Sequence, residues 1–240
     1  VTAVCQDRSK RLWIGTYKGG FFRINRSVDE KKTFSSLPGN PLKLTELIVT
    51  GLLIDRGQTL WIGTSHGLHA YDLSRDSFRE YYVAAERAGS LSHNSVLAIF
   101  EDSSGRLWVG TKDGLNLLDR ERGIFSVFRN DLAQAPAIGR NQIYSIFQDT
   151  HGALWIGTYG GGLCLFGPAA GKFVRDYRLT LDHQEDLDLF NRIEDHLSAN
   201  GLEPTLGHIF EYLDHHPEVA SINQHITLKY EVDQELIKKI

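Results

Sequence analysis

A repeat of 47 or 48 residues constrains this chain more than any other feature of its sequence. Four tryptophans, each starting a Trp-Ile-Gly-Thr or Trp-Val-Gly-Thr tetrapeptide, follow one another at steps of 48, 47 and 47 residues: Trp13, Trp61, Trp108 and Trp155. An aspartate stands six residues before each of them: Asp7, Asp55, Asp102 and Asp149. Such a period is typical of proteins in which one supersecondary unit stacks on the next.

Each copy of the repeat predicts four short strands. In the third copy these are residues 95–101, 106–111, 115–119 and 125–128, and the alternation of Val96, Ala98 and Phe100 places one set of side chains on one face. The aspartate and a following glycine supply turn chemistry between the first two strands. A recurring four-stranded unit of this length is typical of a propeller blade.

The predicted fold is therefore mainly β: a partial β-propeller of four antiparallel four-stranded blades, followed by a small α-helical C-terminal segment. We expect propeller repeats over residues 1–178, with blades at about 1–46, 47–94, 95–141 and 142–178, and a separate unit over 179–240. The signature residues recur in every copy, so they cannot mark one catalytic centre. We expect the tryptophans to pack between blades and the aspartates to hold their turns.

Charge also divides the chain near residue 178. Residues 1–178 carry 22 Lys and Arg against 17 Asp and Glu, a net charge of +5, whereas residues 179–240 carry 4 against 13, a net charge of −9. The positive balance is too weak to indicate a nucleic-acid partner. Of the two cysteines, Cys5 is expected to be buried and Cys164 to face solvent, without a disulfide between them.

The pattern over residues 1–178, an aspartate, a glycine turn, Leu-Trp-Ile-Gly-Thr and Gly-Leu, resembles the two-component regulator propeller repeat. The first copy departs from it at Lys10, where the third and fourth copies have the turn glycine. The resemblance implies the ligand-sensing module of a bacterial two-component-type signal receptor, in a periplasmic or other extracytoplasmic location. It also implies about seven blades, so that further blades or another chain would complete the ring.

A ligand is expected on one particular face of the propeller. The connection between the second and third strands of a blade shares a face with the long connections between blades, at about 35–46, 83–94 and 130–141, and variable loops on a rigid scaffold commonly bind ligands. The candidates for binding an oligosaccharide or peptide are Tyr17, Lys18, His66, His93, Lys112, Asp113, Arg140 and Tyr159. Solvated loop residues without a ligand are the alternative.

Helical periodicity replaces the strand pattern after residue 179. The first predicted helix spans Gln184–Ala199, capped by Asp182 or His183, with Leu187, Phe190, Ile193 and Leu197 on its apolar face. The second spans residues 205–215, with Leu206, Ile209, Phe210 and Leu213 apolar, and 232–240 is a possible third helical piece. The histidines of this segment do not have the spacing of a metal motif.

The sequence of residues 178–227, including Arg-Leu-Thr-Leu-Asp at 178–182, resembles the C-terminal end of cytidylyltransferase-like enzymes of surface-sugar synthesis. This second resemblance implies that Asp182 corresponds to a carboxylate near the magnesium of that active site, a role that suits an oxygen ligand. The nucleotide-binding half of those enzymes has no counterpart in residues 1–178. We therefore expect this segment to be catalytically inert.

Three functions stay open at this point: a sensing module, a C-terminal fragment of a sugar-nucleotide cytidylyltransferase, and a structural propeller for protein interaction. The repeats cover most of the chain, which favours the sensing module and the structural propeller. We therefore expect that the chain is not an enzyme and binds no cofactor; magnesium would be needed only if it were a cytidylyltransferase fragment. The chain has no methionine and starts with a strand pattern. We expect it to begin inside a longer protein, and any membrane attachment to be through other parts of that protein. We expect a cytoplasmic location only if the cytidylyltransferase resemblance of the C-terminal segment reflects its function.

Overall fold

The computed structural model describes residues 1–25, 28–34, 47–84, 88–129, 141–150, 152–159, 161–167, 172–177, 179 and 183–224, with residues 167 and 172–176 described as backbone only. These residues form four antiparallel sheets of four strands, each strand paired with its neighbour in sequence. The predicted mainly β fold with a helical C-terminal segment is confirmed. The strands of the third copy start and end within one residue of their predicted limits.

The strands of each blade follow one another directly. The first sheet contains β1 (Ala3–Gln6), β2 (Leu12–Gly15), β3 (Phe21–Asn25) and β4 (Glu30–Phe34). The second contains β5 (Val49–Ile54), β6 (Thr59–Thr64), β7 (Gly67–Asp72) and β8 (Ser77–Tyr81). The third contains β9 (Val96–Glu101), β10 (Leu107–Thr111), β11 (Gly114–Asp119) and β12 (Ile124–Phe128). The fourth contains β13 (Ile143–Gln148), β14 (Leu154–Thr158), β15 (Gly162–Gly167) and β16 (Lys172–Tyr177).

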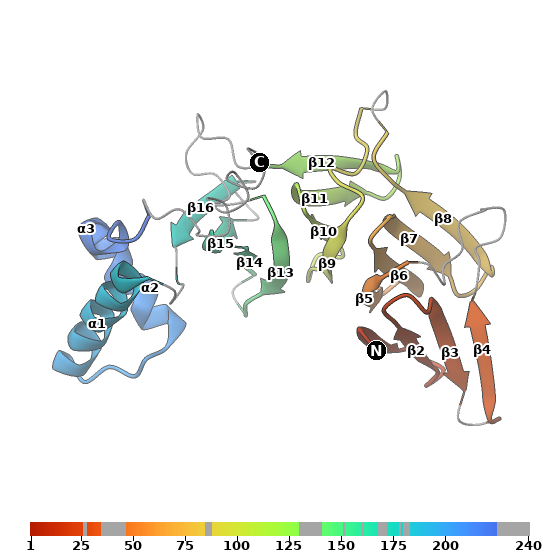
Figure 1. The fold of residues 1–240 in the computed structure, drawn as a ribbon, viewed down its shortest axis with the longest axis horizontal. Coiled ribbons are helices and arrows are strands. Elements are labelled where there is room, and N and C mark those ends of the chain that lie inside the picture. The colour runs from red at the N-terminus through yellow and green to blue at the C-terminus, as the bar shows by residue number, and fades with distance from the viewer. Residues whose placement is uncertain are drawn as a thin grey trace, which may run out of the picture.

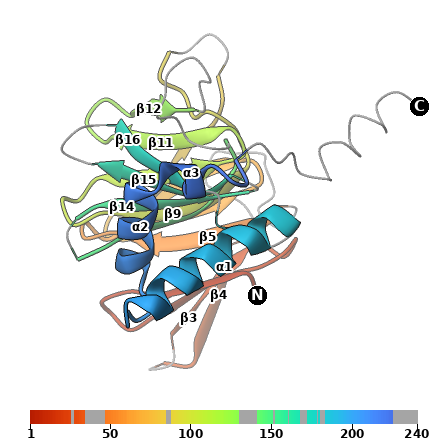
Figure 2. The ribbon, with the colours of Figure 1, turned by 90° about the vertical axis from the view of Figure 1, so that its left-hand side faces the viewer.

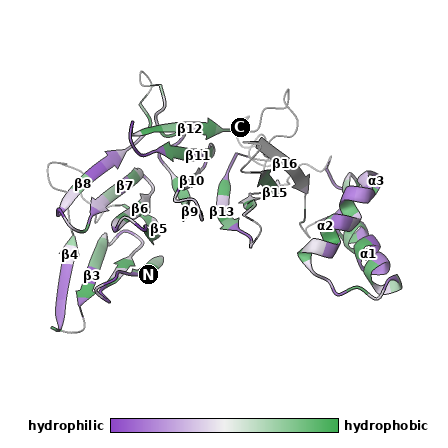
Figure 3. Ribbon diagram, turned by 180° about the vertical axis from the view of Figure 1, so that it is seen from behind, coloured by the Kyte–Doolittle hydropathy of each residue, from purple (hydrophilic) through white to green (hydrophobic). Residues whose placement is uncertain are grey.

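The four sheets stand side by side in an open arc (Figure 1). The first strands β1, β5, β9 and β13 lie on its inner side and contact one another in that order. The fourth strands lie on the outer side, where β4 and β8 are largely hydrophilic (Figure 3). The described sheets do not close into a ring, and the helical segment lies at the end of the arc formed by the fourth sheet (Figures 1 and 2).

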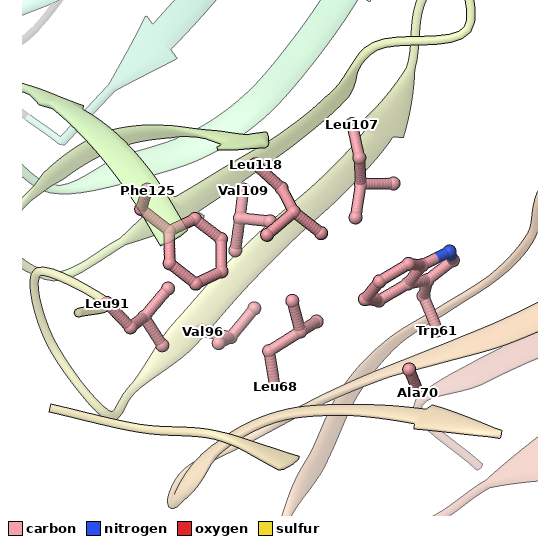
Figure 4. Close-up of a cluster of buried hydrophobic side chains, with 9 residues drawn as sticks. All are labelled: Trp61, Leu68, Ala70, Leu91, Val96, Leu107, Val109, Leu118 and Phe125. Atoms are coloured by element: carbon pink, nitrogen blue, oxygen red, sulfur yellow. The ribbon is translucent and has the colours of Figure 1, made fainter. Parts of the chain in front are cut away.

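A hydrophobic cluster fills each of the three spaces between neighbouring sheets. The cluster between the second and third sheets contains Trp61 and Leu68 from one sheet and Val96, Leu107 and Val109 from the other (Figure 4). Trp13 and Trp108 occupy the corresponding clusters on either side. The predicted packing of these tryptophans between blades is confirmed.

A sheet inside the arc has neighbours on both faces, and this overturns one prediction. Cys164 on β15 is fully buried, whereas the sequence pattern placed it in solvent. Its equivalents on β7 and β11, His69 and Asn116, are buried as well. Alternation along a strand distinguishes the two faces, but it does not expose one of them when both are covered. Cys5 is half-buried against the first cluster, and no disulfide joins it to Cys164, as predicted.

The glycines of the first three signature tetrapeptides, Gly15, Gly63 and Gly110, allow the next blade to approach closely. A Cβ atom at Gly110 would lie 2.7 Å from Ile143 Cγ2 and 2.9 Å from the Ile143 carbonyl oxygen. We therefore expect Gly110→Ala to lower the free energy of unfolding in urea by about 1–3 kcal/mol through overpacking. Gly51→Ala is the control, because a Cβ there meets no atom within 4 Å. Equal stability of the two variants would contradict this role for Gly110.

Three helices follow the last sheet: α1 (Gln184–Ala199), α2 (Leu206–His215) and α3 (Pro217–Ala220). The limits of α1 are those predicted, with His183 as its N-cap. The predicted apolar faces are wrong in part, because Leu187 and Leu206 are exposed. Asp186 and Leu189 of α1 are buried instead. The buried Asp186 carboxylate accepts a 2.6 Å hydrogen bond from Asn223 Nδ2. The possible helical piece at 232–240 lies outside the described residues.

The helical segment covers the face of the fourth sheet that a next blade would cover. In the first and third sheets the signature tryptophan contacts an aromatic residue of the next sheet: Trp13 contacts Tyr71 at 5.6 Å between ring centroids, and Trp108 contacts Phe166 at 5.0 Å. In the fourth sheet Trp155 stacks instead on Phe210 of α2, at 4.6 Å. A helix residue therefore takes the position of a strand residue.

Candidate functional site

The signature aspartates and tryptophans have structural roles in every blade. The Oδ2 atom of each aspartate accepts a hydrogen bond from the indole N–H of its own blade's tryptophan, at 3.0, 2.8, 2.9 and 2.9 Å along the chain. The Oδ1 atom accepts from the backbone N–H four residues later, at 2.8–3.0 Å. These carboxylates hold the first turn of each blade, as predicted, and they also connect it to the second strand.

The carboxylate of Asp102 stays ionised although it is fully buried. Burial raises its pKa, but hydrogen bonds from the Trp108 indole and from the Arg106 backbone and side chain together outweigh burial, so the pKa lies below its usual value of 3.8. The pKa of Asp7 is lowered by the same balance, with Trp13 and Arg11 as the donors. A group held this firmly in the charged form does not suit proton transfer near neutral pH.

The turns between second and third strands lie on the same face as the entries into the first strands. In the last three blades, the residue after the signature threonine donates its backbone N–H to the residue just before the first strand of its own blade. These bonds run from Ser65 to Ile48, from Lys112 to Ser95 and from Tyr159 to Gln142, at 3.0, 3.1 and 2.9 Å. We call this side of the arc, with the turns after Thr16, Thr64, Thr111 and Thr158, the loop face.

The fourth blade carries a pair of exposed aromatic rings on the loop face. The rings of Tyr144 and Tyr159 lie 5.7 Å apart between centroids, and the two residues are 52% and 46% exposed. Tyr159 was among the predicted candidates, whereas Tyr144 was not. The strand pattern on β13 did indicate that Tyr144 is out of phase with buried Ile143, and this signal identifies it in retrospect.

The other candidates form separate groups, one for each blade. In the first, the Lys18 ammonium lies 5.8 Å from the centre of the Tyr17 ring. In the second, His66 Nδ1 lies 3.0 Å from Ser65 Oγ.

In the third blade, Asp113 accepts a 3.0 Å hydrogen bond from Arg129 Nε and a 3.3 Å bond from Asn141 Nδ2. Lys112 is exposed beside it. His93 Nδ1 accepts from the Ser95 backbone at 2.8 Å, so this histidine shapes the entry into β9. Arg129 was not predicted as a site residue.

Arg140 and Asp182 lie outside the described residues, as do most of the connections at 35–46 and 130–141. Within the part of the chain that the structure describes, no group of three or more His, Cys, Asp or Glu side chains is arranged to hold a metal ion. No helix among those residues is long and apolar enough to cross a membrane.

A model of the two-component regulator propeller family matches three segments of the chain, at residues 1–18, 90–113 and 138–160. Each segment covers the first two strands of a blade and its Asp–Trp pair. The matched part of the sequence is therefore the part whose packing role is described above. No curated protein sequence matches the chain.

Solved structures similar to this chain include extracellular domains of bacterial two-component systems. The extracellular domain of a putative hybrid two-component system from B. thetaiotaomicron is 25% identical, with a TM-score of 0.61 over 73% of this chain and 24% of that one. A second such domain from the same organism is 26% identical, with a TM-score of 0.56 over 68% of this chain and 21% of that one.

PorZ, a surface component of the type-IX secretion system of Porphyromonas gingivalis, shares the fold at 18% identity, with a TM-score of 0.55 over 73% of this chain and 27% of that one. The present chain thus spans about a quarter of the length of these proteins. It is similar to propeller domains of two-component sensor proteins. None of these matches supports the cytidylyltransferase resemblance of residues 178–227, which stays a prediction.

Proposed function

We propose that this chain is part of the ligand-sensing propeller of a bacterial two-component-type receptor, and that it acts in the periplasm or outside the cell. One observation carries the proposal: the recurring signature side chains are committed to packing, whereas the side chains on the loop face differ from blade to blade and are exposed or half-buried. Variable residues on a rigid scaffold provide specificity without changing the fold. The extracellular domains similar to this chain support the location.

The proposed ligand is an oligosaccharide or a peptide, bound across Tyr17, Lys18, His66, His93, Lys112, Asp113, Arg140 and Tyr159, with Tyr144 added. Aromatic rings stack on the apolar faces of sugar rings or side chains, and charged groups give hydrogen bonds that set orientation. Of these residues, Tyr144 and Tyr159 provide the paired aromatic surface. The proposal needs no cofactor and no nucleic acid.

Completion of the ring is part of the same proposal. Leu60 and Ile62 of the second blade are fully buried against the first blade, whereas their equivalents Leu12 and Ile14 in the first blade are only half-buried. Further blades, from the same receptor or from another chain, would cover this face as the first blade covers the second. Any membrane attachment would belong to other parts of the receptor.

Binding of a panel of neutral and acidic oligosaccharides and of peptides, measured by titration calorimetry, tests the proposal. We expect Tyr159→Ala to weaken binding of the best ligand about tenfold or more, because tyrosine is enriched among the few interface residues whose truncation costs over about 1 kcal/mol. Phe147→Ala is the matched control: this aromatic residue is 60% exposed on the same strand as Tyr144 but near its other end. Binding of no panel member, or equal losses in both variants, would favour a structural propeller.

A further inference from the structure

A cleft of about 370 Å³ lies at the end of the second blade opposite the loop face. Its wall runs from Thr59 and Asp72, which begin β6 and end β7, to Arg120 of the third blade. Since Thr64 and Gly67 form the loop-face end of the same two strands, the cleft and the loop face are on opposite sides of the arc. The cleft is therefore separate from the site described above.

A break in the repeat makes this cleft. The residue paired with the signature tryptophan on the third strand is large in the other blades, where it is Arg23, Leu117 or Leu165, but it is Ala70 in the second. Figure 4 shows the short Ala70 side chain beside Trp61. Two residues before the tryptophan, Thr59 replaces the arginine of the first and third blades. Small side chains at both positions leave the space beside Trp61 open.

Arg120 replaces the missing arginine from the neighbouring blade. Its Nη1 donates to Asp55 Oδ2 at 2.5 Å and its Nη2 to Glu101 Oε1 at 3.1 Å, while the guanidinium lies 5.6 Å from the centre of the Trp61 ring. The Arg120 Nε N–H is buried and has no acceptor among the described residues. The wall of the cleft thus holds a fixed guanidinium with one unused donor.

The mouth of the cleft adds one uncompensated positive charge, that of Arg79, because Arg75 is paired with Asp72. Arg75 and Arg79 line it, and the one carboxylate among the lining residues is that of Asp72. Hydrogen bonds from Ser74, followed by those from Arg75, lower the pKa of Asp72 to about 2, so this charge is already compensated within its own turn. Arg79 is exposed and has no ion-pair partner in the described part of the chain.

We propose that this cleft binds a carboxylate-bearing small molecule about the size of one sugar ring. Its volume lies near the lower end of the range for small-molecule sites, about 300–1,000 Å³. Trp61 and Tyr81 line it and supply apolar surface for a ring, while arginine side chains bind carboxylates through paired N–H groups. The site is independent of the loop face, and both can be occupied at once.

Titration calorimetry of the 240-residue chain with galacturonate, benzoate and galactose tests the assignment. We expect one of the two acids to bind at least tenfold more tightly than galactose; which acid it is identifies the ring that the cleft accepts. Ala70→Leu should weaken that binding at least tenfold, because leucine stands at this position in the third and fourth blades and would fill the cleft. Arg79→Ala, an exposed change that does not affect packing, should weaken it about tenfold.

Two control variants distinguish this cleft from other sites. Arg122→Ala should bind the acid as the parent chain does, because Arg122 has the position in the third blade's turn that Arg75 has in the second. Tyr159→Ala should also bind the acid as the parent chain does. The cleft proposal and the loop-face proposal can therefore be refuted independently of each other. Equal binding of galactose and the acids, no binding at all, or full binding by both Ala70→Leu and Arg79→Ala would overturn the proposal.

Discussion

Asp102→Ala is expected to lower the free energy of unfolding by about 2–5 kcal/mol. The carboxylate is buried and accepts four hydrogen bonds, from the Trp108 indole at 2.9 Å, from the Arg106 backbone and side chain at 2.9 and 2.6 Å, and from the Ser104 backbone at 3.0 Å. Alanine removes every acceptor at once, and each donor left buried without a partner costs about 1–3 kcal/mol. Urea unfolding followed by tryptophan fluorescence measures the loss.

Asp119→Ala provides the comparison for this variant. Asp119 also begins a turn, where it accepts from the backbone N–H groups of Glu121 and Arg122 at 3.0 Å, but its side chain is 39% exposed. Water can replace the lost acceptor there, so we expect a loss of about 1 kcal/mol or less. If both substitutions cost the same, the buried aspartate of the repeat would not have the structural role assigned to it.

The pH dependence of the Asp102 variant follows from the direction of the pKa shift. Because the folded-state pKa lies below 3.8, the carboxylate contributes stability that is fully present above that value and is lost as pH falls through the folded-state pKa. The difference in unfolding free energy between the parent chain and Asp102→Ala should therefore be constant from pH 7 to about 5 and become smaller below about 4. A difference that grows on acidification would contradict this direction.

Phe210→Ala is expected to release the helical segment from the fourth sheet, at a cost of about 3–5 kcal/mol. Phe210 is buried and stacks on both Trp155 and Tyr177, at 4.6 and 5.3 Å between ring centroids. Without it the Trp155 ring loses the contact that replaces a next blade. We expect a red shift of tryptophan fluorescence and faster proteolysis between residues 178 and 206.

Leu206→Ala is the matched change on the same helix, because Leu206 is 56% exposed. It should leave the fluorescence and the proteolysis rate as they are in the parent chain. If Phe210→Ala behaves in the same way as Leu206→Ala, the helices are not held by the Trp155 contact. That result would leave residues 183–224 as an appendage rather than a cover for the sheet.

Much of the fold follows from local sequence pattern. The spacing of the Asp–Trp signature placed the strands of the third copy within one residue, because turn residues and alternation act over a few positions at a time. The limits of α1 were predictable for the same reason, from a capping residue and an apolar period. The family resemblance of residues 1–178 agrees with the similarity to sensor propellers.

The candidate site was predictable only in outline. The loop face could be located, because the alternating direction of strands puts certain turns on one side. The pairing of Tyr159 with Tyr144 was not predicted, since it depends on how the turn of one hairpin lies beside the entry into another strand. The Arg120 contact with Asp55 was equally unpredictable from the sequence, because it joins residues 65 positions apart in different blades.

Sequence alone thus determined the period, the strand order within each blade and the change to helices after residue 179, all of which depend on neighbours along the chain. Packing between sheets decided the rest: that Cys164 is buried, that Phe210 covers Trp155, and that Ala70 leaves a cleft. These features depend on which faces meet in space. A residue's phase along a strand assigns it to a face, but only the neighbouring sheet or helix decides whether that face is covered.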